Sequence, residues 1–328
     1  MSILVTGGAG YIGSHVVNYL AKNERDIVII DNLSTGHKEA VKGLNLYIGD
    51  IRDTDFLIKV LKENKVKAVM HFAASSSVGE SQSNPEKYYY NNVGGTLSLL
   101  QAMRKCHVDS IVFSSSAAVY GEPESVPITE EADTKPINVY GRTKLMIEQI
   151  LEDYSMTYGI NYISLRYFNA CGADESGEIG EDHNPETHLI PITLQVAGGK
   201  RDKLIIYGDD YDTPDGTCIR DYIHVNDLAN AHVLALDYLI KEQKSGKYNL
   251  GYGKGYSVRE IIQAVEKVTG IKVNTEIGSR RQGDPPILIA DSTKIQQELG
   301  WNPQYNDLEY IIKTAWKWHK RFPDGFKN

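Results

Sequence analysis

A strand, a glycine-rich turn and a helix follow one another near the start of the sequence. The apolar run Ile3-Leu4-Val5 enters Thr6-Gly-Gly-Ala-Gly-Tyr-Ile-Gly13, and helical spacing continues to residue 22. Glycines at 7, 10 and 13 permit a tight turn and let the backbone approach a ligand. The helix start offers free N–H groups and the positive end of its dipole. This arrangement predicts a dinucleotide-binding unit.

The same alternation of apolar runs and helical segments continues through the first half of the chain. Further apolar runs are Ile27-Val-Ile-Ile30, Ala68-Val-Met70, Ile111-Val-Phe113 and Tyr162-Ile-Ser-Leu165, and helical spacing is found at 13–22, 56–61 and 89–103. Apolar strands separated by helices are typical of a parallel sheet covered on both faces. We therefore expect an α/β fold with a doubly wound parallel sheet of the Rossmann type.

After about residue 169 this rhythm ends. Gly, Asp, Asn and Pro become frequent at 171–191 and 208–216, and helical patterns return at 225–241, 258–269 and 308–321. We expect a dinucleotide-binding domain at 1–168 and a second, smaller α/β substrate domain at 169–328. Segments near 220–250 are expected to return to the first domain.

Composition excludes several classes of protein. The 35 Lys and Arg against 43 Asp and Glu give a net charge of −8, which repels nucleic-acid backbones. No apolar run approaches the ~18 residues of a membrane span, and no secretion signal is evident, so a cytoplasmic protein is expected. Cys106, Cys171 and Cys218 form no CxxC, and the nine histidines show no HExxH or Cys/His ligand spacing, so no metal site is indicated.

An acidic residue ends the second apolar run. Asp31 stands 18 residues beyond Gly13, where a carboxylate can accept both ribose hydroxyls of an adenosine and would repel a 2′-phosphate, which favours NAD over NADP. The alternative is a capping Asp at an ordinary strand–turn–helix junction. Asp50 follows a third expected strand and fits an adenine contact or a helix cap equally well.

A tyrosine and a lysine open the helical segment that follows the run ending at Phe113. In Tyr140-Gly-Arg-Thr-Lys144 the two side chains share a helix face, and Ser116 lies at the carboxyl end of the preceding strand. A cation about 5 Å from the phenol, at an effective dielectric of about 20, contributes roughly 3 kcal/mol, or about two pKa units. Tyr140 is thus a candidate base, with Ser116 a partner for a substrate hydroxyl. The alternative is an ordinary surface pair.

These motifs together resemble the extended branch of the short-chain dehydrogenase/reductase superfamily, and within it the UDP-glucose (UDP-galactose) 4-epimerases. The closer resemblance lies in His71-Phe-Ala-Ala74, Val78-Gly-Glu-Ser81, Asn91-Asn-Val93, Leu165-Arg-Tyr-Phe-Asn169, Gly180-Glu-Asp182, Thr213-Pro-Asp-Gly-Thr217, Arg220-Asp-Tyr-Ile-His-Val225 and Arg280-Arg-Gln-Gly-Asp284. It extends from residue 3 to about residue 291.

The resemblance implies NAD-dependent inversion of C4 of a UDP-hexose through a transient 4-keto sugar. It implies that Tyr140 is the base, that Lys144 lowers its pKa and holds the nicotinamide ribose, and that Ser116 bonds the 4′-oxygen. The positions that match NAD contacts are Gly7, Gly10, Tyr11, Ile12, Gly13, Asp31, Asn32, Asp50, Ile51, Phe72, Ala73, Ala74, Asn91, Ser114, Tyr140, Lys144 and Tyr167. The positions that match UDP-sugar contacts are Ser116, Tyr140, Asn169, His188, Leu189, Tyr207, Arg220, Arg281, Asp284 and Leu288.

Three positions depart from the pattern of a well-studied bacterial relative. Ser76 stands where a lysine often contacts NAD. His188 replaces a uridine-binding asparagine and could substitute for it or cap a helix. Leu288 is smaller than the tyrosine that excludes N-acetylated sugars in some relatives, so activity on UDP-N-acetylglucosamine is expected.

Other functions share parts of this pattern. A sugar-nucleotide 4,6-dehydratase would need a carboxylate pair after Ser116, where Ala117 and Ala118 stand. A pentose or uronic-acid UDP-sugar epimerase would use the same catalytic residues and remains open. A nicotinamide-binding regulator would have no need of the Tyr, Lys and Ser set. Without the resemblance, Arg220 and Asp221 could form a structural ion pair. By analogy with relatives, a homodimer through the helices at 89–103 and 140–154 is expected.

Overall fold

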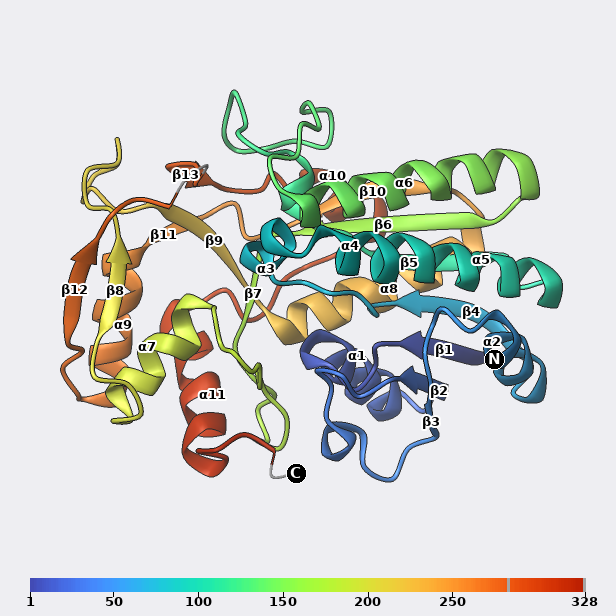
Figure 1. Cartoon of the computed structure of the whole chain (residues 1–328), viewed down its shortest axis with the longest axis horizontal. Helices are drawn as coiled ribbons and strands as arrows, with labels where there is room; N and C mark the ends of the chain where they lie inside the picture. Colours follow the sequence, from blue (N-terminus) through green and yellow to red (C-terminus); the bar gives the residue numbers. More distant parts are fainter. Residues whose placement is uncertain (282–283, 327–328) are drawn as a thin grey trace.

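A seven-stranded sheet forms the larger part of the molecule in the computed structural model, which describes residues 1–281 and 284–326. The strand order is β10-β6-β5-β4-β1-β2-β3, and every neighbouring pair runs parallel (Figure 1). The strands are β1 Ser2–Thr6, β2 Asp26–Asp31, β3 Leu46–Ile48, β4 Val66–His71, β5 Ser110–Ser114, β6 Asn161–Tyr167 and β10 Gly246–Leu250. The five expected apolar strands are all found in this sheet.

Helices cover both faces of this sheet. They are α1 Tyr11–Lys22, α8 Val225–Glu242 and α10 Thr293–Leu299 on one face, and α2 Thr54–Glu63, α5 Gly95–Cys106 and α6 Val139–Tyr158 on the other. In β1, Ile3 and Val5 pack toward α1 and α8 whereas Leu4 packs toward α2 and α5, and all three are fully buried. The strand needs apolar residues at every position for this reason. The expected doubly wound α/β fold is confirmed.

The remaining chain forms a smaller α/β part beside the sheet. Its elements are β7 Asn169–Cys171, α7 Leu189–Ala197, β8 Leu204–Tyr207, β9 Ile219–His224, β11 Gly255–Ser257, α9 Val258–Thr269, β12 Thr275–Gly278, β13 Ile287–Leu288 and α11 Leu308–Arg321. Strand β9 pairs with β7, β11 and β13, while β8 pairs with β12. Helices α7, α9 and α11 enclose a separate apolar core. Helix α8 and strand β10 come after residue 168 in the sequence, yet they pack with the larger sheet. The expected division into domains at 1–168 and 169–328 stays a prediction.

The segment expected as one helix at 89–103 is interrupted. Helix α4 (Pro85–Tyr88) passes into a π-helical stretch, η2 (Tyr89–Gly94), before α5 begins. The side chain of Asn92 in that stretch is fully buried, accepts a hydrogen bond from the Ser75 backbone at 2.8 Å and donates to Thr143 at 3.2 Å. Short π-helical stretches within α-helices often occur at functional sites.

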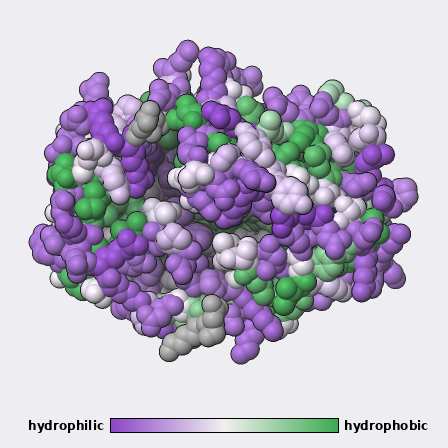
Figure 2. All heavy atoms as spheres, in the orientation of Figure 1, coloured by the Kyte–Doolittle hydropathy of each residue, from purple (hydrophilic) through white to green (hydrophobic). Residues whose placement is uncertain are grey.

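The start of α6 is set by a capping residue. The side-chain oxygen Oδ1 of Asn138 accepts a hydrogen bond from the Gly141 backbone N–H at 2.8 Å, which places Tyr140 in the first turn of the helix and Lys144 one turn later. The other short elements are η1 Lys38–Val41, α3 Val78–Ser83 and η3 Ala117–Val119. Over the described ranges, no helix combines the length and apolarity that crossing a membrane requires. Figure 2 shows a mostly hydrophilic face with scattered apolar patches.

Candidate active site

The expected cofactor residues gather along one edge of the large sheet. Strands β6, β5, β4, β1 and β2 are parallel neighbours, so their carboxyl ends meet there. The loop after β1 holds Gly7 and Gly10, and α1 opens with Tyr11, Ile12 and Gly13; β2 ends in Asp31, followed by Asn32; Asp50 and Ile51 follow β3; Phe72, Ala73 and Ala74 follow β4; Ser114 and Tyr167 end β5 and β6; and Asn91 lies in η2.

The glycine turn packs directly on the loop after β4. Gly7 has a φ of +69°, and a Cβ on it would lie 2.6 Å from the backbone nitrogen of Ala73. A Cβ on Gly13 would lie 2.2 Å from the carbonyl oxygen of Gly7. Helix α1 starts after Gly10 without a side-chain cap from any described residue, so its first N–H groups face the turn. Bare backbone and open N–H groups fit a pyrophosphate.

Asp31 ties this turn to the end of β2. Its carboxylate, 7% exposed, accepts hydrogen bonds from the backbone N–H of Ala9 at 2.9 Å and of Leu33 at 2.8 Å. Burial raises the pKa of Asp31, and the two backbone hydrogen bonds act against that rise. The carboxylate therefore caps no helix, and it lies at the carboxyl end of β2 beside the glycine turn. The residues at this edge fit an NAD molecule.

Asp50 has a different role from the helix cap considered above. Its carboxylate is 2.8 Å from Nε of Arg52, and hydrogen bonding to Arg52 lowers the pKa of Asp50. The cap of α2 is instead Asp53, which accepts from the Phe56 backbone at 3.0 Å. The capping interpretation of Asp50 is wrong because α2 begins at Thr54 and its N-cap, Asp53, lies three residues after Asp50.

Tyr140, Lys144 and Ser116 come together at the end of β5. The Lys144 ammonium is buried, donates to the carbonyl oxygen of Ser114 at 2.7 Å and lies 5.5 Å from the centre of the Tyr140 ring. The Tyr140 hydroxyl is hydrogen-bonded to the side chain of Ser116. Next to them, the hydroxyls of Ser114 and Tyr167 are hydrogen-bonded to each other. The surface-pair alternative is therefore wrong.

The pKa of Tyr140 differs from the expectation. Desolvation by the surrounding protein raises it to about 12, and the hydrogen bond with Ser116 only partly opposes this. Burial also lowers the pKa of Lys144 to about 7, although the charge of Glu148 acts in the opposite direction. Attraction between the two charges favours an ionised Tyr140, but the cost of burying each charge outweighs that attraction.

A buried polar network behind Lys144 was not anticipated. Arg166 in β6 binds Glu148 with Nε at 2.9 Å and Nη2 at 2.5 Å, Ser115 donates to Glu148 at 2.6 Å, and Arg166 reaches the Tyr120 hydroxyl at 2.8 Å. An arginine within the mostly apolar strand β6 was the one signal that could have revealed this network, because a buried guanidinium requires a counter-charge.

The expected substrate residues lie mainly in the smaller part of the molecule. Asn169 in β7 donates to the backbone oxygen of Asp221 at 3.1 Å. Arg220 forms an ion pair with Asp284, whereas Asp221 accepts hydrogen bonds from the backbone of Tyr252 and Gly253 at 2.9 and 3.0 Å. The Arg220–Asp221 ion pair is therefore wrong, because successive residues of β9 point to opposite sides.

Further substrate candidates occupy the neighbouring loops and strand ends. The guanidinium of Arg281 lies 4.1 Å from the centre of the Tyr207 ring. Leu288 in β13 stands in register with Arg220 and packs on the apolar cluster Ala117, Val119, Tyr120 and Ile128, which begins directly after Ser116. His188 occupies the position before α7, whose first residue is Leu189, but its side chain does not cap the helix.

The doubly wound sheet, the glycine turn with Asp31 and the Tyr140–Lys144 pair define an extended short-chain dehydrogenase/reductase. Residues 3–251 match the NAD dependent epimerase/dehydratase family. The chain is 53% identical to a UDP-glucose 4-epimerase of Halalkalibacterium halodurans, over 99% of this chain and 98% of that relative. It therefore belongs to the UDP-glucose 4-epimerases of this family, which confirms the expected family and NAD as its cofactor.

Solved structures show the same likeness in three dimensions. A UDP-glucose 4-epimerase from Brucella ovis in complex with NAD superimposes with a TM-score of 0.94 at 52% identity, covering 96% of this chain and 97% of that one. The enzyme from Bifidobacterium longum in complex with NAD⁺ and UDP gives a TM-score of 0.94 at 42% identity, covering 99% and 100%.

Proposed function

We propose that this enzyme interconverts UDP-glucose and UDP-galactose by inverting C4 of the sugar, with NAD⁺ held between turnovers. The observation that carries the proposal is the contact of Tyr140 with Ser116 and Lys144 at the sheet edge formed by the glycine turn. The relatives support the proposal, because UDP-glucose 4-epimerases match this chain along nearly its whole length.

In the proposed mechanism, Tyr140 moves the proton. Its phenolic oxygen takes the proton of the 4′-hydroxyl and later returns it to the 4′-oxygen, which the Ser116 hydroxyl holds in place. Bound NAD⁺ supplies the acceptor and donor of the C4 hydride. Since burial raises the pKa of Tyr140 to about 12, ionisation of the phenol depends on nearby positive charge. A phenolate beside Lys144 favours the ammonium form of that lysine, so the two groups ionise together.

The UDP group would be held by residues of the smaller part. Arg220 and Arg281 supply fixed positive charge for a diphosphate, and a guanidinium can bind two phosphate oxygens at once. Asp284 holds Arg220 in place through their ion pair. We assign Asn169, Leu189 and Tyr207 to the same site.

A broader range of sugars follows from Leu288. This side chain is partly buried against the segment that begins after Ser116. Because a leucine there leaves more room than a tyrosine would, we propose that UDP-N-acetylglucosamine is also a substrate. Galactose metabolism in the cytoplasm is the proposed setting.

A homodimer is the proposed assembly. Three large apolar side chains on the helices expected to pair are exposed: Tyr90 (64%) in η2, Leu97 (40%) in α5 and Met146 (43%) in α6. A second copy would cover them. Sedimentation at micromolar concentration should show a dimer, and a monomer alone would contradict it.

The decisive experiment is incubation of the purified protein with UDP-galactose and no added NAD, followed by separation of the C4 epimers. We expect turnover by the wild type and a loss of about 10³-fold or more in Tyr140→Phe, with NAD still bound. Tyr158→Phe, at the exposed end of the same helix, is the matched control and should retain full turnover. Equal activity of Tyr140→Phe and wild type would overturn the proposal.

A further inference from the structure

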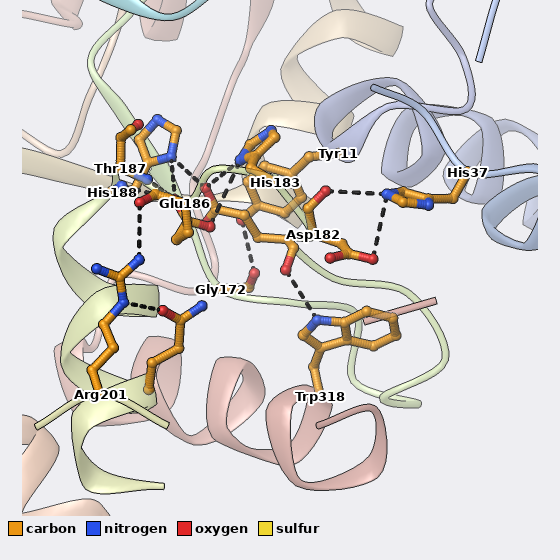
Figure 3. A network of polar contacts seen from close by, with 12 residues as sticks. Tyr11, His37, Gly172, Asp182, His183, Glu186, Thr187, His188, Arg201 and Trp318 are labelled. Atoms are coloured by element: carbon orange, nitrogen blue, oxygen red, sulfur yellow. Dashed lines mark hydrogen bonds and ion pairs between the residues drawn. The ribbon is translucent and has the colours of Figure 1, made fainter. Parts of the chain in front are cut away.

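Four potential metal ligands converge on the loop between β7 and α7. Glu181, His183, Glu186 and His188 each offer one side-chain atom, and these atoms all lie within 4.8 Å of one another. Figure 3 shows the imidazoles of His183 and His188 side by side, with dashed lines to the carboxylate oxygens between them. The residues follow the spacing Glu-x-His-x-x-Glu-x-His.

The distances between these atoms resemble those within a coordination shell. Oε1 of Glu181 is 2.8 Å from Nδ1 of His188 and 3.2 Å from Nδ1 of His183. Glu186 places Oε1 at 3.0 Å from Nδ1 of His188 and Oε2 at 3.8 Å from Nδ1 of His183. Four ligands about 2.1 Å from a tetrahedral zinc ion are about 3.4 Å apart. Small side-chain movements would therefore complete such a shell.

Two buried carboxylates at this point are balanced by histidine side chains rather than by Lys or Arg of the described chain. The side chains of Glu181 and Glu186 are 5% and 3% exposed, and neither carboxylate pairs with a Lys or Arg of the described chain. Arg201 lies nearby, but it donates to the backbone oxygen of Glu186 rather than to the carboxylate (Figure 3). Two buried carboxylates need compensating positive charge, and only the two imidazoles supply it here.

The surroundings hold the cluster in position from several elements. Tyr11 at the start of α1 packs edge-on against His183, with ring centres 6.1 Å apart, and donates its hydroxyl proton to Gly172 at 2.7 Å. Trp318 in α11 donates to the backbone oxygen of Glu181 at 3.1 Å. Glu186 accepts the backbone N–H of His188 at 2.8 Å. Such outer contacts orient metal ligands in known sites.

We propose that Glu181, His183, Glu186 and His188 bind one divalent transition-metal ion, for which Zn²⁺ is the probe. Two imidazole nitrogens and two carboxylate oxygens suit zinc better than Mg²⁺ or Ca²⁺, which prefer oxygen ligands alone. The ion takes no part in the C4 chemistry. It fixes the loop before α7 against α1, and this role does not depend on the proposed function.

The test is zinc binding by the full-length protein after removal of metals with a chelator. Titration against a chromogenic zinc chelator at mildly alkaline pH, where the imidazoles can release their protons, should show one tight site per chain. His183→Gln and Glu186→Gln should each weaken that site by about 100-fold or more. His107→Asn is the matched control, because His107 is exposed, lies at the end of α5 and has a φ of 55° that asparagine tolerates. Excess Mg²⁺ should not displace the zinc.

Thermal unfolding provides a second readout that does not require activity. An ion that binds only the folded chain raises its unfolding temperature. Zinc should therefore stabilise the wild type and His107→Asn, but not His183→Gln, whose own unfolding temperature without metal shows that it folds. Absence of a tight site, or equal zinc binding by all the variants, would overturn the proposal and leave a cluster compensated by protonated imidazoles.

Discussion

Glu148 lies one helical turn after Lys144 on α6, and its two carboxylate oxygens are held by Arg166 at 2.9 and 2.5 Å. The ion pair is buried, with side-chain exposures of 0% for Glu148 and 3% for Arg166. The charge of Glu148 also raises the pKa of Lys144 against the lowering caused by burial. The β6 strand thus supports the proposed proton-transfer residues through Glu148.

Replacing Glu148 by glutamine should destabilise the fold. The amide keeps the shape of the side chain but leaves the Arg166 charge buried without a partner, which costs about 3–5 kcal/mol. The free energy of unfolding in urea measures this cost. Glu152→Gln is the control on the same helix, since its pair with Lys247 is partly exposed and should contribute about 1 kcal/mol or less. Similar losses in the two variants would contradict a special role for Glu148.

Lys144 is expected to reduce the stability of the protein. Its pKa is lowered to about 7 in the folded chain and lies near ~10.4 in an unfolded chain, so between these values the unfolded chain binds more protons. Stability should therefore rise with pH across this window, and the full cost applies below about pH 7. Lys144→Met should stabilise the protein by about 1–3 kcal/mol below that pH while abolishing turnover.

Denaturant unfolding of metal- and cofactor-stripped protein at a mildly acidic and an alkaline pH measures this effect. The gain in Lys144→Met should shrink as the pH rises toward the free-lysine value. Lys59→Met, at an exposed position of α2, is the control and should show neither the gain nor its pH dependence. A loss of stability in Lys144→Met at both pH values would refute the prediction.

The glycine turn allows a sharper test of cofactor retention. Gly13→Ala would place a methyl group 2.2 Å from the carbonyl oxygen of Gly7, whereas Gly79→Ala in α3 meets nothing within 4 Å. Overpacking of about 1–3 kcal/mol corresponds to roughly 10–100-fold weaker NAD binding. NAD released from purified protein on denaturation should fall in Gly13→Ala and be unchanged in Gly79→Ala. Full retention by both variants would rule out close packing at this turn.

The sequence was most informative where a segment is buried on both sides. The strands containing Ile3, Ile27, Val69, Val112 and Ile163 were recognisable because their central positions are almost all apolar. Strand β10 mixes polar and apolar residues at one edge of the sheet, so no pattern indicated it, whereas the edge strand β3 was expected before Asp50. The π-helical stretch at 89–94 carries Asn92, whose contacts with Ser75 and Thr143 cannot be inferred from local spacing.

Site residues were predictable where they lie in or directly after a recognisable helix or strand. Tyr140 and Lys144 lie one turn apart on a helix, and Ser116 lies just beyond the identifiable strand β5, so their proximity could be inferred. The direction of the Tyr140 pKa shift could not, because desolvation depends on the packed surroundings. The Glu-x-His-x-x-Glu-x-His spacing likewise lies in a loop, where convergence of side chains follows from the fold rather than from a helical period.

Leu288 should determine whether acetylated sugars are accepted. It stands in register with Arg220 and packs against the apolar segment that follows Ser116, so a larger side chain would project toward the proposed sugar site. Leu288→Tyr should reduce kcat/KM for UDP-N-acetylglucosamine by about 10–100-fold, an overpacking cost of about 1–3 kcal/mol, and leave that for UDP-galactose nearly unchanged. Leu288→Met conserves volume and should keep both activities. If the wild type fails to convert the acetylated sugar, or if Leu288→Tyr slows both substrates alike, Leu288 does not set the selectivity.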